Sequence, residues 1–195
     1  MSAQAKRKLT ATEYLAIERK AEFKSDFFNG KMFAMAGASR WHNTIKDNLI
    51  VEIGNRMKGS GCRTYSSDQR VLIDDTGLYC YPDIVLQCGQ PEFLDDSEDV
   101  LLNPTAIIEV LSPSTFRYDR VVKFRHYRAL PSLQEYILVE QEEAAVDRYC
   151  RQADGSWAMV SFVGLEAVME LLCVPVRVPL ADIYAGVPFP LPASE

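Results

Sequence analysis

The chain has 195 residues, of which 48% are hydrophobic and 25% charged, with a net charge of −6 and a pI near 5.1. This composition is that of an ordinary globular protein, and we expect one domain over residues 1–195 with its core at about 10–185. The acidic balance argues against a surface that coats nucleic acid, and no apolar run reaches the length of a membrane span, so we expect a cytoplasmic protein.

The cysteine and histidine content excludes several kinds of site. An odd number of cysteines without C-x-x-C spacing predicts neither a disulfide framework nor a zinc knuckle. With only His42 and His126, a histidine-rich transition-metal site is poorly supported. The cysteines are Cys62, Cys80, Cys88, Cys150 and Cys173.

The first elements are marked by local signals. The run from Thr10 to Glu13 has the capping-box pattern and predicts a helix to about Lys20. Asn29-Gly30 between apolar runs predicts a tight hairpin, with Asp26 near its open end. A second helix begins after Ser39, carries one apolar stripe, and ends at Gly59.

Short strands follow that helix. The pattern predicts strands at 62–66 and 69–73, joined to the next segment by a turn at 74–77. Residues 89–104 are rich in turn residues and in irregularly spaced carboxylates. Because this spacing lacks the calcium-loop pattern, we expect a surface loop there.

Two apolar segments, 81–86 and 106–111, each carry one carboxylate where a solvated side chain is least expected. Asp83 follows Pro82, which donates no backbone hydrogen bond, so we expect Asp83 at a strand start or on an edge. Glu109 shares its strand face with apolar residues. A single acid in such a strand is more often an outward-facing residue, but a buried pair would require a metal, a proton or a partner. The pair predicts a divalent-cation site.

A basic helix follows at about 116–130, after a turn at 112–115. Between Arg117 and Arg128, five cations oppose only Asp119, which gives a local charge of +4. Such a run is usually a solvated helix face, but beside a carboxylate strand it predicts a phosphate-attracting wall. Asp119 and Lys123 share a helix face, and the simple interpretation is a surface ion pair.

The remaining pattern predicts mostly strands. These fall at 136–139, at 146–151 and 157–163 around a turn at 153–156, and at 168–174, followed by a helical turn at 180–184. The fold class predicted for the chain is therefore α/β, with a mixed β-sheet flanked by helices.

Several stretches together resemble the Uma-two family of restriction endonucleases, within the PD-(D/E)XK nuclease superfamily. The resemblance covers about residues 10–185, and it rests on the series "YPDIVLQCG", "NPTAIIEVLSPST" and "YDRVVKFRHYRALPSLQEYILVEQ". It implies a restriction-endonuclease-like core. Two positions depart from the pattern: Leu111 stands where the superfamily has lysine, and Asp26 where the family usually has glutamate.

The resemblance also implies a mechanism. Asp83 and Glu109, with the carbonyl of Val110, are expected to bind magnesium or manganese, since oxygen ligands suit these ions. Lys123 replaces the missing lysine and would orient or deprotonate the attacking water, while Asp26 would hold water or a second metal. His42, Arg117 and Arg120 are candidates for DNA contact, although His42 is equally well read as a structural residue.

Three other functions compete with DNA cleavage. A serine hydrolase using Ser112 or Ser114 lacks the G-x-S-x-G context. A nucleotide-binding enzyme lacks a glycine-rich phosphate loop. The serious alternative is a degraded nuclease-fold protein that binds nucleic acid or a protein partner. For a cutting enzyme we expect a homodimer, paired through the late strands near Tyr149, Trp157 and Phe162.

Overall fold

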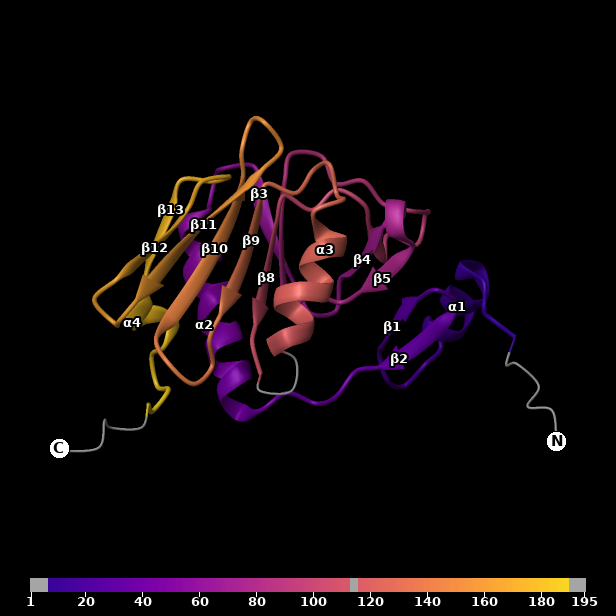
Figure 1. Ribbon diagram of the computed structural model, residues 1–195, viewed down its shortest axis with the longest axis horizontal. Coiled ribbons are helices and arrows are strands. Elements are labelled where there is room, and N and C mark those ends of the chain that lie inside the picture. Colours follow the sequence, from indigo (N-terminus) through magenta and orange to yellow (C-terminus); the bar gives the residue numbers. More distant parts are fainter. Residues whose placement is uncertain (1–6, 113–115, 190–195) are drawn as a thin grey trace.

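The protein is built from two large sheets that lie side by side, a two-stranded sheet of β12 and β13, and helices that pack on these sheets (Figure 1). The structure is a computed structural model that describes residues 7–112 and 116–189. This mixed α/β arrangement confirms the predicted fold class. The strands are β1 Ser25–Phe28, β2 Lys31–Ala34, β3 Cys62–Ser66, β4 Arg70–Ile73, β5 Leu78–Cys80, β6 Ile84–Cys88, β7 Val100–Leu101, β8 Ala106–Val110, β9 Glu135–Val139, β10 Ala145–Arg151, β11 Trp157–Val163, β12 Val168–Leu171 and β13 Val176–Pro179.

The helices are short except for one. The α-helices are α1 Ala11–Glu18, α2 Arg40–Arg56, α3 Phe124–Tyr127 and α4 Leu180–Ile183; η1 Asp74–Thr76 is a 3₁₀ turn and η2 Tyr118–Lys123 is a π-helix. No helix in the described ranges is long and apolar enough to cross a membrane.

The five-stranded sheet has the order β2-β1-β5-β4-β7 and begins as the sequence predicts. Thr10 and Glu13 form a complete capping box at the start of α1. Asn29 and Gly30 have φ values of 49° and 79°, which is the left-handed backbone that the β1–β2 hairpin needs. Helix α1 buries Tyr14 against this sheet, where its ring stacks on Phe27.

The six-stranded sheet has the order β11-β10-β9-β8-β6-β3 and is antiparallel except for the β8–β9 pair. Side chains alternate between two cores because successive strand residues point to opposite faces. On one face, Ile84 and Ile108 pack against α2. On the other face, Val85 and Ile107 pack against the segment that contains η2 and α3. The second core also contains residues of β4 and β5, so it joins the two sheets.

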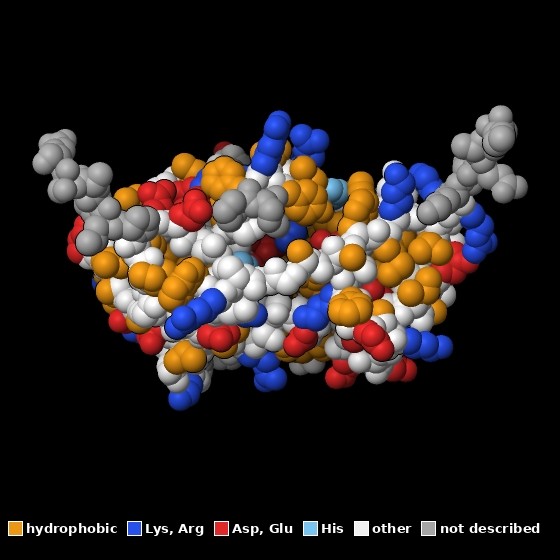
Figure 2. Space-filling view, turned by 90° about the horizontal axis from the view of Figure 1, so that it is seen from below, with side chains coloured by type: hydrophobic (Ala, Val, Ile, Leu, Met, Phe, Trp, Pro, Cys, Tyr) orange, Lys and Arg blue, Asp and Glu red, His pale blue; other side chains and the backbone are white. Residues whose placement is uncertain are grey.

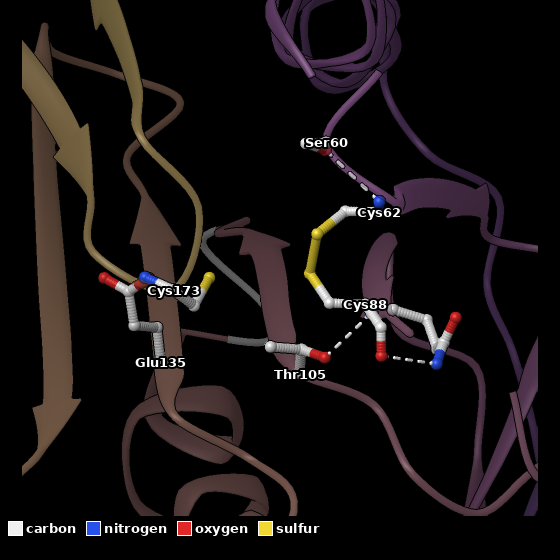
Figure 3. Close-up of a disulfide and its surroundings, with 7 residues drawn as sticks. Ser60, Cys62, Cys88, Thr105, Glu135 and Cys173 are labelled. Atoms are coloured by element: carbon white, nitrogen blue, oxygen red, sulfur yellow. Dashed lines mark hydrogen bonds between the residues drawn. A yellow bond between two sulfur atoms is a disulfide. The ribbon is translucent and has the colours of Figure 1, made fainter. Parts of the chain in front are cut away.

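The structure corrects the cysteine prediction. Cys62 and Cys88 face each other across the β3–β6 ladder and form a disulfide (Figure 3). The sequence could not reveal this bridge, because the two residues become neighbours only through the strand register. Cys80, Cys150 and Cys173 are free thiols.

Several smaller differences concern element type. The surface loop at 89–104 includes the short strand β7, and β13 was not predicted. The basic helix has π geometry over Tyr118–Lys123, at whose end the Phe124 N–H donates to the Asp119 carbonyl five residues earlier. At its start, the Phe116 N–H donates to the Ser112 carbonyl over 2.9 Å. Ser114 lies outside the described residues.

Candidate active site

Strand register brings the two predicted carboxylates together. Ile84 pairs with Ile108 in the antiparallel β6–β8 ladder, so the same register carried one residue further sets Asp83 opposite Glu109. Backbone hydrogen bonds fix the pair. The Asp83 N–H donates to Glu109 Oε2 over 3.3 Å, and the Val110 N–H donates to Asp83 Oδ2 over 2.8 Å. Asp83 stands immediately before β6, as the preceding proline predicts.

His42 holds Asp83 from the other side. It lies in the first turn of α2, where the Ser39 hydroxyl caps the helix by accepting the His42 N–H. Its Nε2 lies 3.1 Å from Asp83 Oδ2. Burial alone would raise the pKa of Asp83, but hydrogen bonding to His42 and to the Val110 N–H lowers it below the ordinary value. Asp83 is therefore held as a carboxylate.

Lys123 enters the site from the π-helix η2. Its Nζ lies 2.9 Å from Glu109 Oε1 and 3.2 Å from Asp119 Oδ1. Lys123 is only 8% exposed and Asp119 only 3%, so the interpretation of this pair as a surface ion pair is wrong. Burial alone would lower the pKa of Lys123, but neighbouring carboxylates, Glu109 first among them, raise it well above the ordinary value. A lysine held in its charged form can supply positive charge and hydrogen bonds, but not a base.

Glu109 is the most enclosed acid of the site. Its Oε1 accepts from Lys123 and also from the Tyr127 hydroxyl, which is 2.9 Å away. Burial raises the pKa of Glu109 to about 8; Lys123 opposes this rise, while Asp119 and Asp83 add to it. Burial is the main cause of the raised pKa of Glu109, whereas the neighbouring carboxylates are the cause of the raised pKa of Lys123. Several buried carboxylates surround a single lysine, and the cluster therefore retains protons.

Asp26 lies at the rim of the same cluster. Its Oδ1 accepts from the Tyr81 N–H over 3.3 Å, which links β1 to the residues just before Asp83. Burial raises the pKa of Asp26, and Lys123 opposes the rise. The Tyr81 hydroxyl in turn contacts Arg70 Nη2 at 2.6 Å and Glu18 Oε1 at 3.0 Å. A buried polar network thus anchors the turn that carries Asp83.

The two arginines predicted to contact DNA do not join this cluster. Arg120 makes ion pairs of 2.6 Å with both Glu140 and Asp147. Its guanidinium also lies over the exposed Phe116 ring, 4.7 Å from the ring centroid. Arg117 is exposed. Of the five cations that the sequence suggested for a phosphate wall, Arg120 is therefore neutralised by Glu140 and Asp147.

The donor set of the cluster fits a hard divalent cation. Two carboxylates as close as Asp83 and Glu109 repel each other when both are charged, and a cation between them would offset this repulsion. Buried carboxylates also outnumber the one lysine of the cluster. Within residues 7–112 and 116–189, no three His, Cys, Asp or Glu side chains are placed to enclose a metal ion by themselves. An ion held by Asp83 and Glu109 would therefore need the Val110 carbonyl, water or a substrate phosphate as further ligands, which is how magnesium is commonly bound.

The cluster lies at the end of the molecule where β8 ends and α2 begins (Figure 1). Viewed from that end, the surface is hollowed near its middle, and acidic, basic and histidine side chains lie at the bottom of the hollow (Figure 2). Sequence reasoning missed Asp119 and Tyr127 as members of the site. Their one signal is helical spacing, since each lies four residues from Lys123.

Comparison with a solved structure defines the class of fold. A crystal structure from Anabaena variabilis, described as "a putative nuclease belonging to DUF820", matches this chain with a TM-score of 0.73. The match covers 91% of this chain and 98% of that chain at 18% sequence identity. The two proteins therefore share one mixed α/β fold.

The chain belongs to the Uma2 (Uma-two) family, described as "Putative restriction endonuclease", whose sequence profile matches residues 11–181. Two proteins of Synechocystis sp. strain PCC 6803 are similar along nearly their whole length. "Uncharacterized protein sll1609" is 38% identical over 166 residues, covering 83% of this chain and 92% of the relative. "Uncharacterized protein slr1290" is 33% identical over 182 residues, covering 93% of this chain and 94% of the relative. These matches confirm the predicted family.

Proposed function

We propose that the protein is a magnesium- or manganese-dependent endonuclease that hydrolyses phosphodiester bonds of DNA. The observation that carries this proposal is the pair formed by Asp83 and Glu109, set opposite each other across the β6–β8 register and joined to the charged Lys123. The description of the family, "Putative restriction endonuclease", supports phosphodiester hydrolysis as the reaction class. The face seen in Figure 2 has a hollow that contains acidic side chains, and the Asp83 side chain, 16% exposed, keeps access to solvent, which a DNA phosphate would need.

Each residue has a separate task in this proposal. A bound divalent cation supplies charge neutralisation at the phosphate and acidifies water. Asp83 and Glu109 would hold the ion, with the Val110 carbonyl as a third ligand. Because Lys123 is kept charged, it would offset the negative charge that develops on the phosphate rather than remove a proton. Asp26 would hold a water or a second ion at the rim, and His42 orients Asp83 through the 3.1 Å contact.

The test is a cleavage assay on plasmid and on single-stranded DNA, with magnesium, with manganese and with EDTA. We expect cleavage with either metal and none with EDTA. Asp83→Asn and Glu109→Gln should each abolish cleavage while the protein stays folded, because both substitutions replace a carboxyl group that would ligate the ion by an amide. Asp96→Asn and Glu98→Gln, matched changes on the exposed 89–104 loop, should cleave like the wild type. Undiminished activity of both site variants would refute the proposal.

The alternative of a degraded nuclease that only binds its target is favoured by one observation: Leu111, at the lysine position of the superfamily, is a buried core residue. If the protein only binds DNA, the DNA should stay intact in the presence of metal, and the protein should still retard its migration in a gel. Cleavage that depends on Glu109 excludes this alternative.

We further propose that the protein pairs as a homodimer through β11. This strand is the free edge of the six-stranded sheet, and its sequence WAMVSFV carries no charge or proline that would discourage edge pairing. Met159, Val160 and Val163 are 52%, 44% and 65% exposed. Tyr149 and Trp157, which the sequence suggested for the interface, pack against Phe124 instead. The interface we propose therefore leaves out these two residues.

Light scattering tests the dimer. We expect roughly 44 kDa at micromolar concentration, twice the 22.0 kDa chain. Val160→Lys should give a monomer, because a charged edge residue opposes strand pairing. Val51→Lys, at a 55% exposed position of α2, should leave the dimer intact. A wild-type monomer would overturn this part of the proposal.

A further inference from the structure

A second concave site lies on the same sheet face as Glu109, beyond the helical segment that carries Lys123. It is a groove of about 640 Å³ between α3 and the β10–β11 hairpin. Phe124, Tyr149 and Trp157 supply its aromatic side, and Arg125 and Arg128 its basic side. Figure 1 shows α3 lying over this face of the sheet, close to the hairpin. A groove of this size can hold a small ligand.

The aromatic side of the groove is held in place before any ligand arrives. The Phe124 ring stacks on Tyr136, with centroids 5.3 Å apart, and meets Trp157 edge to face at 5.4 Å. The Arg151 guanidinium lies 4.8 Å from the Trp157 ring centroid. That arginine is itself fixed by hydrogen bonds of 2.7–2.9 Å to carbonyl groups of residues 128, 130 and 133. Fixed rings bind a flat ligand with little loss of side-chain freedom.

The basic side of the groove carries charge without a described ion-pair partner. Arg125 and Arg128 are three residues apart on one helical face and both are exposed. In the part of the chain that the structure describes, neither guanidinium lies within ion-pair distance of a carboxylate. The contrast with Arg120 is direct, since that arginine pairs with both Glu140 and Asp147. The chain has a net charge of −6, so two arginines beside aromatic rings, unpaired among the described residues, make this groove a positively charged site in an acidic protein.

We propose that this groove is a nucleotide-binding site, distinct from the carboxylate cluster. Phe124 is already covered by Tyr136 and by the Arg128 guanidinium, 5.6 Å from its ring centroid. Tyr149 and Trp157 therefore provide the stacking surface for a base. The two arginines provide donors for its phosphate. The ligand is a free nucleotide or one nucleotide of a single strand, two sources with the same chemistry. Phe124 directly follows Lys123, so the ligand would rest on the helix that positions that lysine.

Fluorescence of Trp157 tests the site directly. The chain has two tryptophans, so a Trp41→Phe variant leaves Trp157 as the reporter. Titration in EDTA with dAMP, and with a short oligodeoxyadenylate, measures binding without metal-dependent cleavage. We expect saturable quenching. Arg128→Ala and Arg125→Ala should each weaken it about tenfold, the scale of one charge-assisted hydrogen bond. Arg63→Ala, which removes an exposed arginine from β3, should change nothing.

The outcomes distinguish a free nucleotide from a single strand as the ligand, and both from failure of the proposal. Saturation by dAMP identifies a free-nucleotide site, and saturation by the oligonucleotide alone identifies a strand contact; both support the proposal. Absence of saturation with both ligands would overturn it, as would quenching that is unchanged in Arg125→Ala and Arg128→Ala. Competition by inorganic phosphate as tight as the binding of dAMP would also overturn it, because the base would then contribute nothing. None of these results depends on catalysis by the carboxylate cluster.

Discussion

The two sides of the η2 segment differ in a way that its sequence does not display. On the inner side, Asp119 and Lys123 are buried against Glu109, and Lys123 is held as a charged group between carboxylates. On the outer side, Arg120 pairs with Glu140 and Asp147, and among the described residues no ion pair joins it to the cluster. Two cations three residues apart thus have unrelated environments. The lesson is that local charge density does not locate a site, whereas burial together with strand register does.

The largest effect expected from this comparison is on the inner side. Lys123→Met should lower the cleavage rate by about 10²-fold or more, the usual loss when a preorganised charge is removed from a site. Lys123→Arg should recover part of the rate if the residue acts by its charge. If arginine restores nothing, and the variant also loses a rise of cleavage rate with increasing pH that the wild type shows, the lysine acts as a base instead.

The pH dependence of stability provides a second test of the inner side. The folded-state pKa of Glu109 is raised from 4.5 to about 8, so between these pH values the native state binds a proton that the unfolded state has lost. The free energy of unfolding, measured in EDTA, should therefore fall by a few kcal/mol as the pH rises through this window. Asp83, with a lowered pKa, acts in the opposite sense and only at more acidic pH.

Urea denaturation at a series of pH values measures this slope. Glu109→Gln should flatten it, and Glu22→Gln, a matched change at an exposed position, should preserve it. A stability that is constant between these pH values in the wild type would mean that Glu109 ionises normally.

The smallest effect is expected on the outer side. Arg120→Met leaves Glu140 and Asp147, which are 17% and 15% exposed, without their partner. Their remaining exposure to water limits the loss, and we expect about 1 kcal/mol of unfolding free energy. Cleavage should stay within about twofold of wild type, because in the described part of the chain no ion pair joins Arg120 to Asp83 or Glu109. A loss of activity comparable to that of Lys123→Met would restore the phosphate-wall hypothesis.

The sequence revealed those features that depend on neighbouring residues. The capping box at Thr10, the Asn29-Gly30 hairpin and the Ser39 cap are local, and each lies where predicted. Pro82 correctly placed Asp83 at a strand start. The family resemblance then selected Lys123, for which periodicity alone offered a surface ion pair.

What the sequence did not reveal depends on distant contacts. The Cys62–Cys88 bridge requires the β3–β6 register, and the pairing of Arg120 with Asp147 requires the packing of η2 on the sheet. Tyr127 looks like an ordinary core aromatic until its hydroxyl is seen to reach Glu109. Helix periodicity predicts which residues share a face, but not which face meets the acids.

The central claim, that Asp83 and Glu109 together hold a divalent cation, is tested most directly by titrating manganese into the protein and following its electron paramagnetic resonance signal. The wild type should bind the ion saturably, Asp83→Asn and Glu109→Gln should each lose that binding, and Lys123→Met should keep it. Equal binding by all four proteins would contradict the claim, because the ion would then be held by other residues. Absence of binding by the wild type would contradict it as well.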